Sequence, residues 1–277
     1  MMDSGGMHMK NLFEEFANHD SVAGIVIGGS RATGTFDELS DWDIYIYTTS
    51  PIEEAERKAI LEPLVSYMEY GNTFWELEDD GRLLDGTTIE LIYRDLDDFE
   101  AGIHKLLEQA LAGTGYTTCN AHHLQHGLIE YDATKRLEKL KHKLNAPYPQ
   151  ALKDAVILKN SALLKDLIPS FYYQLEKAYK RNDSFSINHR MTELMASYFD
   201  IIYAINEAYH PGEKGLIAHS SKLAKLPEGH TETLEAVFEF MFQNSVACLY
   251  YTRKLIARLE KLILAEGYDL SFARSEF

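Results

Sequence analysis

The sequence predicts an α+β domain, a small mixed sheet packed on helices, followed by an all-α helical bundle. In the first half, short apolar segments typical of strands are interleaved with segments of helical spacing, without a regular strand–helix–strand period. After the proline-containing stretch NAPYPQ (145–150), the pattern is almost entirely helical. We therefore expect two domains, residues 1–145 and 146–277, which suits a chain of 277 residues.

The elements of the first domain are expected in an irregular order. Apolar runs and alternating patterns predict strands at residues 22–27, 44–47, 72–77 and 87–93. Helical spacing predicts helices at residues 10–18, 50–68 and 95–112. Ser50 is expected to cap the second helix, because serine accepts a hydrogen bond from the first turn and Pro51 fits the first helical position.

Helices dominate the second domain. Helical patterns are expected at residues 151–180, with a bend at Pro169, and at 184–209, 220–225 and 228–266. The stretch AYHPGEKGL (208–216) interrupts them. Such a run of helices is typical of an antiparallel bundle.

The composition is acidic. The chain has 27 Lys and Arg against 43 Asp and Glu, a formal net charge of −16. A long nucleic-acid backbone requires a basic surface, so we expect no nucleic-acid partner. A cationic small molecule or a basic protein would suit this charge.

Cysteine content and hydropathy indicate the compartment. Cys119 and Cys248 are too few and too far apart for a disulfide framework or a cysteine-type zinc site. No apolar run approaches the ~20 residues that span a bilayer, and no secretory signal opens the chain. We therefore expect a cytoplasmic protein without a membrane partner, whose oligomeric state the sequence does not indicate.

Acidic side chains stand at the start of the second predicted strand. Asp41 and Asp43 point to one face of it and Trp42 to the other, because strand side chains alternate. Two carboxylates so close repel each other unless a cation lies between them, and paired acids suit Mg²⁺. Glu90, between Ile89 and Leu91, is a third acid that joins them if its strand is the neighbour.

The alternatives for these acids are structural. Asp41 and Asp43 could be solvated acids at a strand edge, and Glu90 an outward-facing strand residue. Asp85 is a competing third acid, although the following Gly86 favours a turn.

A glycine turn ends the first predicted strand. Gly28 and Gly29, followed by a short helix, expose backbone N–H groups that can bind phosphate. Ser30 adds a hydroxyl, and Arg31 is either a phosphate contact or a surface charge. Phosphate donors beside metal-binding acids predict a site for a nucleoside triphosphate.

Gly29-Ser30, ten further residues and then Asp41-Trp42-Asp43 resemble the signature of the DNA polymerase β-like nucleotidyltransferases. Glu90 on a later strand fits the same pattern. With a helical second domain, the chain is most similar to the aminoglycoside nucleotidyltransferase branch. The motif covers residues 28–43 and Glu90; the domain order extends the likeness loosely to the rest.

The resemblance implies roles for these residues. Asp41 and Asp43 would bind Mg²⁺, and Gly28, Gly29, Ser30 and Arg31 would contact the triphosphate of ATP or another nucleotide. Glu90 would either complete a second metal site, with metals ~3.5–4 Å apart, or act as the general base toward the acceptor hydroxyl.

The resemblance also implies a function. We expect a magnesium-dependent transferase that moves a nucleoside monophosphate, AMP from ATP, to a hydroxyl of a small molecule and releases pyrophosphate. An aminoglycoside-like acceptor, and hence antibiotic resistance, is the specific expectation. The alternatives are an antitoxin-like enzyme that adenylylates a protein, and a binding module that has lost catalysis.

Two further features favour structural roles. His122, His123 and His126 include an i, i+4 pair that could bind zinc, but the local Asn and Gly weaken the helix and no protease motif is present. Lys214 lies at the break in the helical half, where a lysine could reach a triphosphate; an exposed loop residue is the simpler interpretation.

Overall fold

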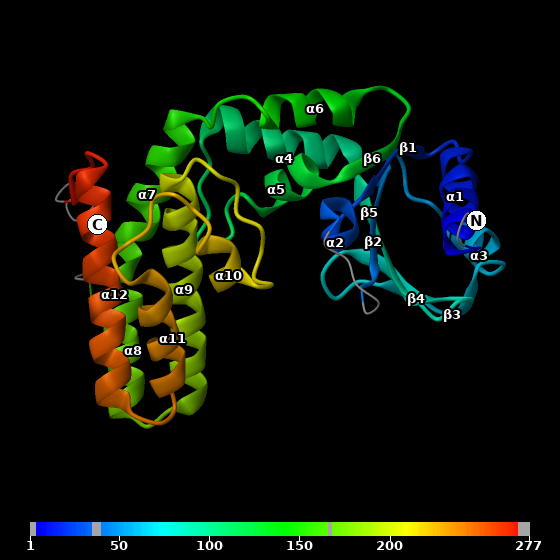
Figure 1. The fold of residues 1–277 in the computed structure, drawn as a ribbon. Coiled ribbons are helices and arrows are strands. Elements are labelled where there is room, and N and C mark those ends of the chain that lie inside the picture. Colours follow the sequence, from blue (N-terminus) through cyan, green and yellow to red (C-terminus); the bar gives the residue numbers. More distant parts are fainter. Residues whose placement is uncertain (1–3, 35–39, 166–167, 271–277) are drawn as a thin grey trace. The chain divides into compact units, whose positions relative to one another are not determined.

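The computed structural model describes residues 4–34, 40–165 and 168–270. The chain forms two compact units, which we describe separately (Figure 1). The first unit holds the chain up to His104 together with Asn120–Ala146. The second holds Lys105–Cys119 and the chain from Pro147 onward. The boundary expected at residue 145 stays a prediction about domains.

The first unit contains a six-stranded sheet flanked by helices. Its strands are β1 (Val22–Ile27), β2 (Trp42–Thr48), β3 (Val65–Asn72), β4 (Leu77–Leu83), β5 (Thr88–Asp95) and β6 (Leu128–Asp132). Its helices are α1 (Ser4–Ala17), α2 (Gly29–Thr33), α3 (Glu54–Leu61), α4 (Leu96–Gln109) as far as His104, α5 (Cys119–His126) from Asn120 onward, and α6 (Arg136–Leu144).

The strand order is β3-β4-β5-β2-β1-β6. The β2–β5 pair is parallel, and the other four pairs are antiparallel. The mixed sheet and the α+β class are thus confirmed, with β2 and β5 side by side at its centre.

Helix α1 covers one face of the sheet. Phe16 lies 6.2 Å from Tyr93 of β5 and Phe13 lies 6.5 Å from Trp42 of β2, measured between ring centroids. Ile44 and Ile46 of β2 belong to the same buried cluster, and Trp42 packs against it. The helix therefore buries its apolar stripe against the even-numbered side chains of β2.

The opposite face of the sheet carries the odd-numbered side chains of β2. Tyr47 contacts Phe99 of α4 at 4.9 Å, and Tyr45 stacks on His123 of α5 at 6.0 Å, measured between ring centroids. Asp43 precedes these tyrosines in the same alternation. It therefore lies at the end of the face that α4 and α5 cover.

The helix predicted for residues 50–68 is wrong in both its start and its length. Helix α3 begins at Glu54 after a capping box in which Glu53 and Glu56 exchange hydrogen bonds with the backbone. It ends at Leu61 with Glu62 as its C-cap, because Pro63 has no backbone N–H to continue the helical hydrogen bonds. The rest of the predicted helix forms β3.

Other elements differ from the predicted pattern at the edges of the sheet. The strand predicted at 72–77 is the turn between β3 and β4. The histidine segment, for which a helix was doubtful, forms α5. Edge strand β6 was not predicted, because the five-residue LIEYD is short and half exposed.

The second unit is a bundle of helices. They are α7 (Gln150–Leu164), α8 (Phe171–Lys180), α9 (Ser184–Ile205), α10 (Leu216–Ser220), α11 (His230–Phe240) and α12 (Ser245–Ala265). Helix α9 packs against α7 and α8, and α11 packs against α12. Nearly every residue from 194 to 205 is buried, so α9 is the centre of the bundle.

Two of the long predicted helices are each divided in two. The bend expected at Pro169 is a complete break, after which Ser170 caps α8 by accepting a hydrogen bond from Tyr173 N–H. The helix expected at 228–266 is interrupted before Asn244, which caps α12 through Ala247 N–H. The short helix expected at 220–225 lies earlier, at α10. Among the described residues, no helix is both long enough and apolar enough to traverse a bilayer.

Candidate active site

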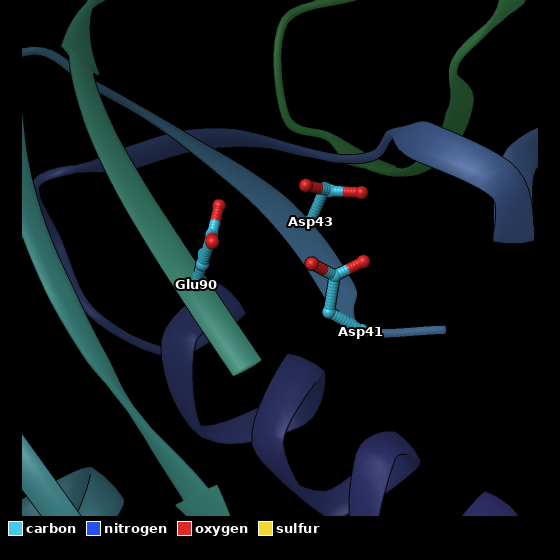
Figure 2. Close-up of side chains that lie close together, drawn as sticks. All are labelled: Asp41, Asp43 and Glu90. Carbon is cyan, nitrogen blue, oxygen red and sulfur yellow. The ribbon is translucent and has the colours of Figure 1, made fainter. Parts of the chain in front are cut away.

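Three carboxylates meet where β2 and β5 begin. Asp41 directly precedes β2, Asp43 is its second residue, and Glu90 lies on β5 in register with Asp43. One carboxylate oxygen from each lies within 4.8 Å of the others, and all three side chains are half-buried. Figure 2 shows the three groups on the same side of the two strands. The sequence predicted that Glu90 joins Asp41 and Asp43 if its strand is the neighbour of theirs, and the parallel pairing of β2 with β5 meets this condition.

The donor set fits a divalent cation. Three carboxylates this close repel one another, and a cation among them removes the repulsion. Oxygen ligands from one or two acids, completed by water and phosphate oxygens, are typical of Mg²⁺ sites. In the described part of the chain, Asp41, Asp43 and Glu90 form the one group of three or more His, Cys, Asp or Glu side chains with this spacing.

The glycine turn packs directly on these acids. Gly28 donates its backbone N–H to the carbonyl of Asp43 at 2.8 Å, and a Cβ atom on Gly28 would lie 2.6 Å from the Tyr45 ring. Gly29 has φ +59°, and a Cβ atom there would lie 1.8 Å from a carboxylate oxygen of Asp43. Only glycine therefore fits at both positions, and the start of α2, with Ser30, is held against the acids.

Arg31 fixes the chain that leads into β2. Its Nε and one Nη donate to the carbonyls of Asp41 and Ser40, each at 2.8 Å. Its guanidinium lies 4.3 Å from the centroid of the Trp42 ring. These contacts hold the backbone of Asp41 in place. The phosphate contact expected for Arg31 stays a prediction.

Tyr45 and Arg94 lie further along β2 and β5 than Asp43 and Glu90, on the same face of the sheet. The sequence did not lead us to expect either residue near the site. The Arg94 guanidinium lies 4.4 Å from the centre of the Tyr45 ring. It donates two hydrogen bonds to Glu76, at 2.5 and 2.7 Å. Burial raises the pKa of Tyr45 well above its ordinary value, so the phenol stays neutral. Continuing the alternation from Asp43 would have placed Tyr45 on this face.

The acidic surface continues beyond Glu90. Asp80 of β4 pairs with Glu90 and is half-buried, and Glu78 pairs with Ile92. Paired residues of antiparallel strands share a face, so Asp80 lies beside Glu90. Asp85, the competing third acid, accepts a hydrogen bond from Thr87 N–H at 2.9 Å and serves the turn.

Among the described residues, the histidine cluster does not join the acids in a group with ligand spacing. The rings of His122 and His126 stack on one another at 4.1 Å on α5, while His123 stacks on Tyr45. Lys214 is exposed in the loop before α10. His126 Nδ1 also lies 3.1 Å from the carbonyl oxygen of His122, within hydrogen-bond distance.

The fold and the acid site define a class of protein. Residues 9–109 match the family model described as a nucleotidyltransferase domain, and this range contains every residue predicted for the site. Residues 9–109 are therefore a nucleotidyltransferase domain, the chain is a nucleotidyltransferase enzyme, and the resemblance to nucleotidyltransferases noted from the motif is confirmed. Residues 117–216 match a second model, described as a domain of unknown function (DUF4037).

Solved structures of low sequence identity are similar to this chain. A nucleotidyltransferase-like protein from Exiguobacterium sibiricum is 12% identical with a TM-score of 0.46, the match covering 98% of this chain and 79% of that one. An aminoglycoside 6-adenyltransferase from Bacillus subtilis is 12% identical with a TM-score of 0.29, covering 94% and 92%. The CCA-adding enzyme of Thermotoga maritima, in complex with tRNA, is 12% identical with a TM-score of 0.29, covering 95% and 82%. A comparison with curated proteins found no significant match.

Proposed function

We propose that this protein transfers a nucleoside monophosphate, AMP from ATP, to a hydroxyl group of a small molecule. The acceptor oxygen attacks the α-phosphorus, the bond between the α- and β-phosphates breaks, and pyrophosphate leaves. The observation that carries the proposal is the set of three carboxylates within 4.8 Å of one another beside a glycine turn.

Asp41 and Asp43 are the proposed ligands of Mg²⁺, since Asp41, directly before β2, and Asp43 of β2 bring their carboxylate oxygens within 4.8 Å of each other. Mg²⁺, when bound, neutralises phosphate charge and orients the triphosphate. Glu90 is the proposed third ligand, because it shares the register of Asp43. The alternative role of Glu90 is to accept the proton of the acceptor hydroxyl.

Gly28, Gly29 and Ser30 are proposed to bind the phosphates through backbone N–H groups and the serine hydroxyl. Support comes from the lack of room for a side chain at either glycine, which leaves the backbone as the surface toward the acids. Arg31 keeps Asp41 in place, and a phosphate contact from Arg31 remains part of the proposal.

The proposed acceptor is a cationic small molecule, such as an aminoglycoside. The acids that extend the site, Asp80 and Glu78, and the net charge of −16 support a positively charged acceptor rather than nucleic acid. Modification of such a molecule would confer antibiotic resistance, and the cytoplasm, which supplies ATP and Mg²⁺, is the proposed compartment.

The test is a transfer assay with ATP labelled at the α-phosphate, Mg²⁺ and a panel of hydroxyl-bearing amines that includes aminoglycosides. Pyrophosphate release together with label on a small molecule is the expected result, and labelled GTP tests the choice of base. Label on a protein from a cell lysate instead supports the protein-modifying alternative. Nucleotide binding without transfer, unchanged by Asp43→Asn, would overturn the proposal.

A further inference from the structure

The second unit contains a cavity of about 680 Å³ that is built without the acid site. One wall is a stripe of α9, with Thr192, Met195, Ala196 and Phe199 at helical i, i+3, i+4 and i+7 spacing. The other walls come from α11, from α10 and from the loop before α10. These helices all belong to the second unit (Figure 1). The volume is that of a small-molecule site.

Tyr116, which lines this cavity, has an unusual backbone conformation. Its φ is +54°, a left-handed value that is uncommon outside glycine. On either side, Gly115 N–H donates to Asn160 at 3.2 Å and Thr117 N–H donates to Asp200 at 3.1 Å. Because Asn160 and Asp200 are buried, the backbone around Tyr116 is anchored to the bundle.

The chemistry of the wall is apolar and negative. Tyr116, Phe199 and Phe238 supply aromatic rings. Glu213 and Glu235 are the two charged residues among the described residues that line the cavity, and neither forms a salt bridge with a described residue. Burial and, next, the Glu213 carboxylate raise the pKa of Tyr116, and both residues line the cavity.

We propose that this cavity binds a small organic ammonium ion with an apolar body. The body would replace water along the α9 stripe, while the charged nitrogen would meet the carboxylates and the faces of the aromatic rings. An anionic ligand would meet the repulsion of both acids, and a neutral one would gain no electrostatic attraction from them. This site stands independently of the proposed nucleotidyl transfer.

The experiment titrates the full-length protein with 2-phenylethylammonium in the absence of nucleotide and Mg²⁺, and follows binding by calorimetry. The neutral probe 2-phenylethanol and the anionic probe 3-phenylpropionate have the same aromatic body. We expect the ammonium ion to bind about tenfold more tightly than the alcohol, from two partly exposed charges and one cation–π contact. Equal affinities for the ammonium ion and the alcohol would overturn the proposal.

Variants assign the binding to this cavity. Glu213→Gln with Glu235→Gln should remove the advantage of the ammonium ion, whereas Glu232→Gln with Glu239→Gln, exposed on α11 outside the cavity, should leave it intact. Thr192→Trp, at an exposed position on the wall, should fill the cavity and abolish binding of every probe. Unchanged binding of the ammonium ion to a folded Thr192→Trp protein would overturn the assignment. Because no nucleotide is present, none of these outcomes depends on catalysis.

Discussion

The acid site of the first unit and the cavity of the second are built in opposite ways. The acid site brings together charged side chains from two neighbouring strands, two of them separated by a single residue. The cavity collects mostly apolar side chains between residues 116 and 238, from two loops and three helices. Burying a charged side chain in a sheet costs free energy unless the charge is paired, so such residues are conspicuous in a sequence. The wall of an apolar cavity, by contrast, has the same sequence pattern as a core.

The largest effect is expected from the acids. Asp43→Asn should lower the rate of transfer by about 10³-fold, because it removes one charge from a metal-binding trio. Glu90→Gln should also cause a large loss. The measurement is pyrophosphate release at saturating ATP, with circular dichroism to verify folding.

Asp85→Asn is the matched control for these acids. It keeps an acceptor for Thr87 N–H in the turn and should leave the rate within a factor of about two, as expected for a surface substitution. A loss at Asp85 equal to that at Glu90 would contradict the assignment of Glu90 as the third acid.

The second effect concerns the contact between the glycine turn and Asp43. Gly29→Ala places a methyl group 1.8 Å from an Asp43 oxygen in the present geometry. A displacement near 1 Å in a catalytic site lowers the rate by about 10²-fold. We therefore expect a loss of that size, measured as kcat for transfer.

Gly34→Ala is the control for backbone strain alone. Gly34 has φ +71°, close to the value at Gly29, and no described atom lies within 4 Å of the added methyl group. It should lose about 1 kcal/mol of stability and keep its activity. If the two variants lose activity equally, strain rather than the clash with Asp43 is the cause.

The third effect is a pH dependence of the free energy of unfolding that comes from Asp200, which anchors the backbone beside Tyr116. Burial raises the pKa of Asp200 to about 6, from an ordinary value of 3.8. A carboxyl with a raised pKa in the fold contributes stability when protonated, which is lost as the pH rises from about 4 to about 6. Asp200→Asn removes this titration.

The stability difference between Asp200→Asn and the wild type should therefore move in favour of the variant as the pH rises. We expect a change on the order of 2 kcal/mol between pH 4 and pH 7.5, measured by urea unfolding of both proteins. A difference independent of pH would show that Asp200 has the same pKa in the folded and unfolded states.

The smallest effect is expected at Arg31. Arg31→Lys keeps the charge but loses the paired hydrogen bonds to the Asp41 and Ser40 carbonyls, so the backbone that carries the proposed ligand Asp41 loosens. The Mg²⁺ concentration for half-maximal rate should rise about fivefold, as for the loss of one or two hydrogen bonds, with KM for ATP unchanged. A higher KM for ATP with unchanged Mg²⁺ dependence would instead indicate a phosphate contact.

The sequence predicted much of the acid site, because its signals are local. Asp41 and Asp43 on one face follow from strand alternation, and Glu90 was conspicuous among apolar neighbours. The close approach of Gly29 to Asp43 could not be predicted, since it depends on how near the turn after β1 passes to β2. Their catalytic roles stay predictions.

The rest of the sheet was harder to predict because its edges carry weak patterns. Strand β3 is only half-buried and its residues continue the helical pattern of α3. Pro63 was therefore the one signal in this stretch that the helix ends before β3. Tyr116 was missed for another reason. Its conformation depends on Asn160 and Asp200, which are distant in the sequence and become neighbours only in the bundle.

The alignment of Asp43 with Glu90 has a consequence for how this chain can vary. A slip of one residue between β2 and β5 would turn one acid toward α1 and dismantle the trio, because side chains alternate between faces. The excursion through α3, β3 and β4 begins and ends outside that alignment. Insertions or deletions in α3, β3 or β4 can change the surface beside the acids and leave the alignment of Asp43 with Glu90 unchanged.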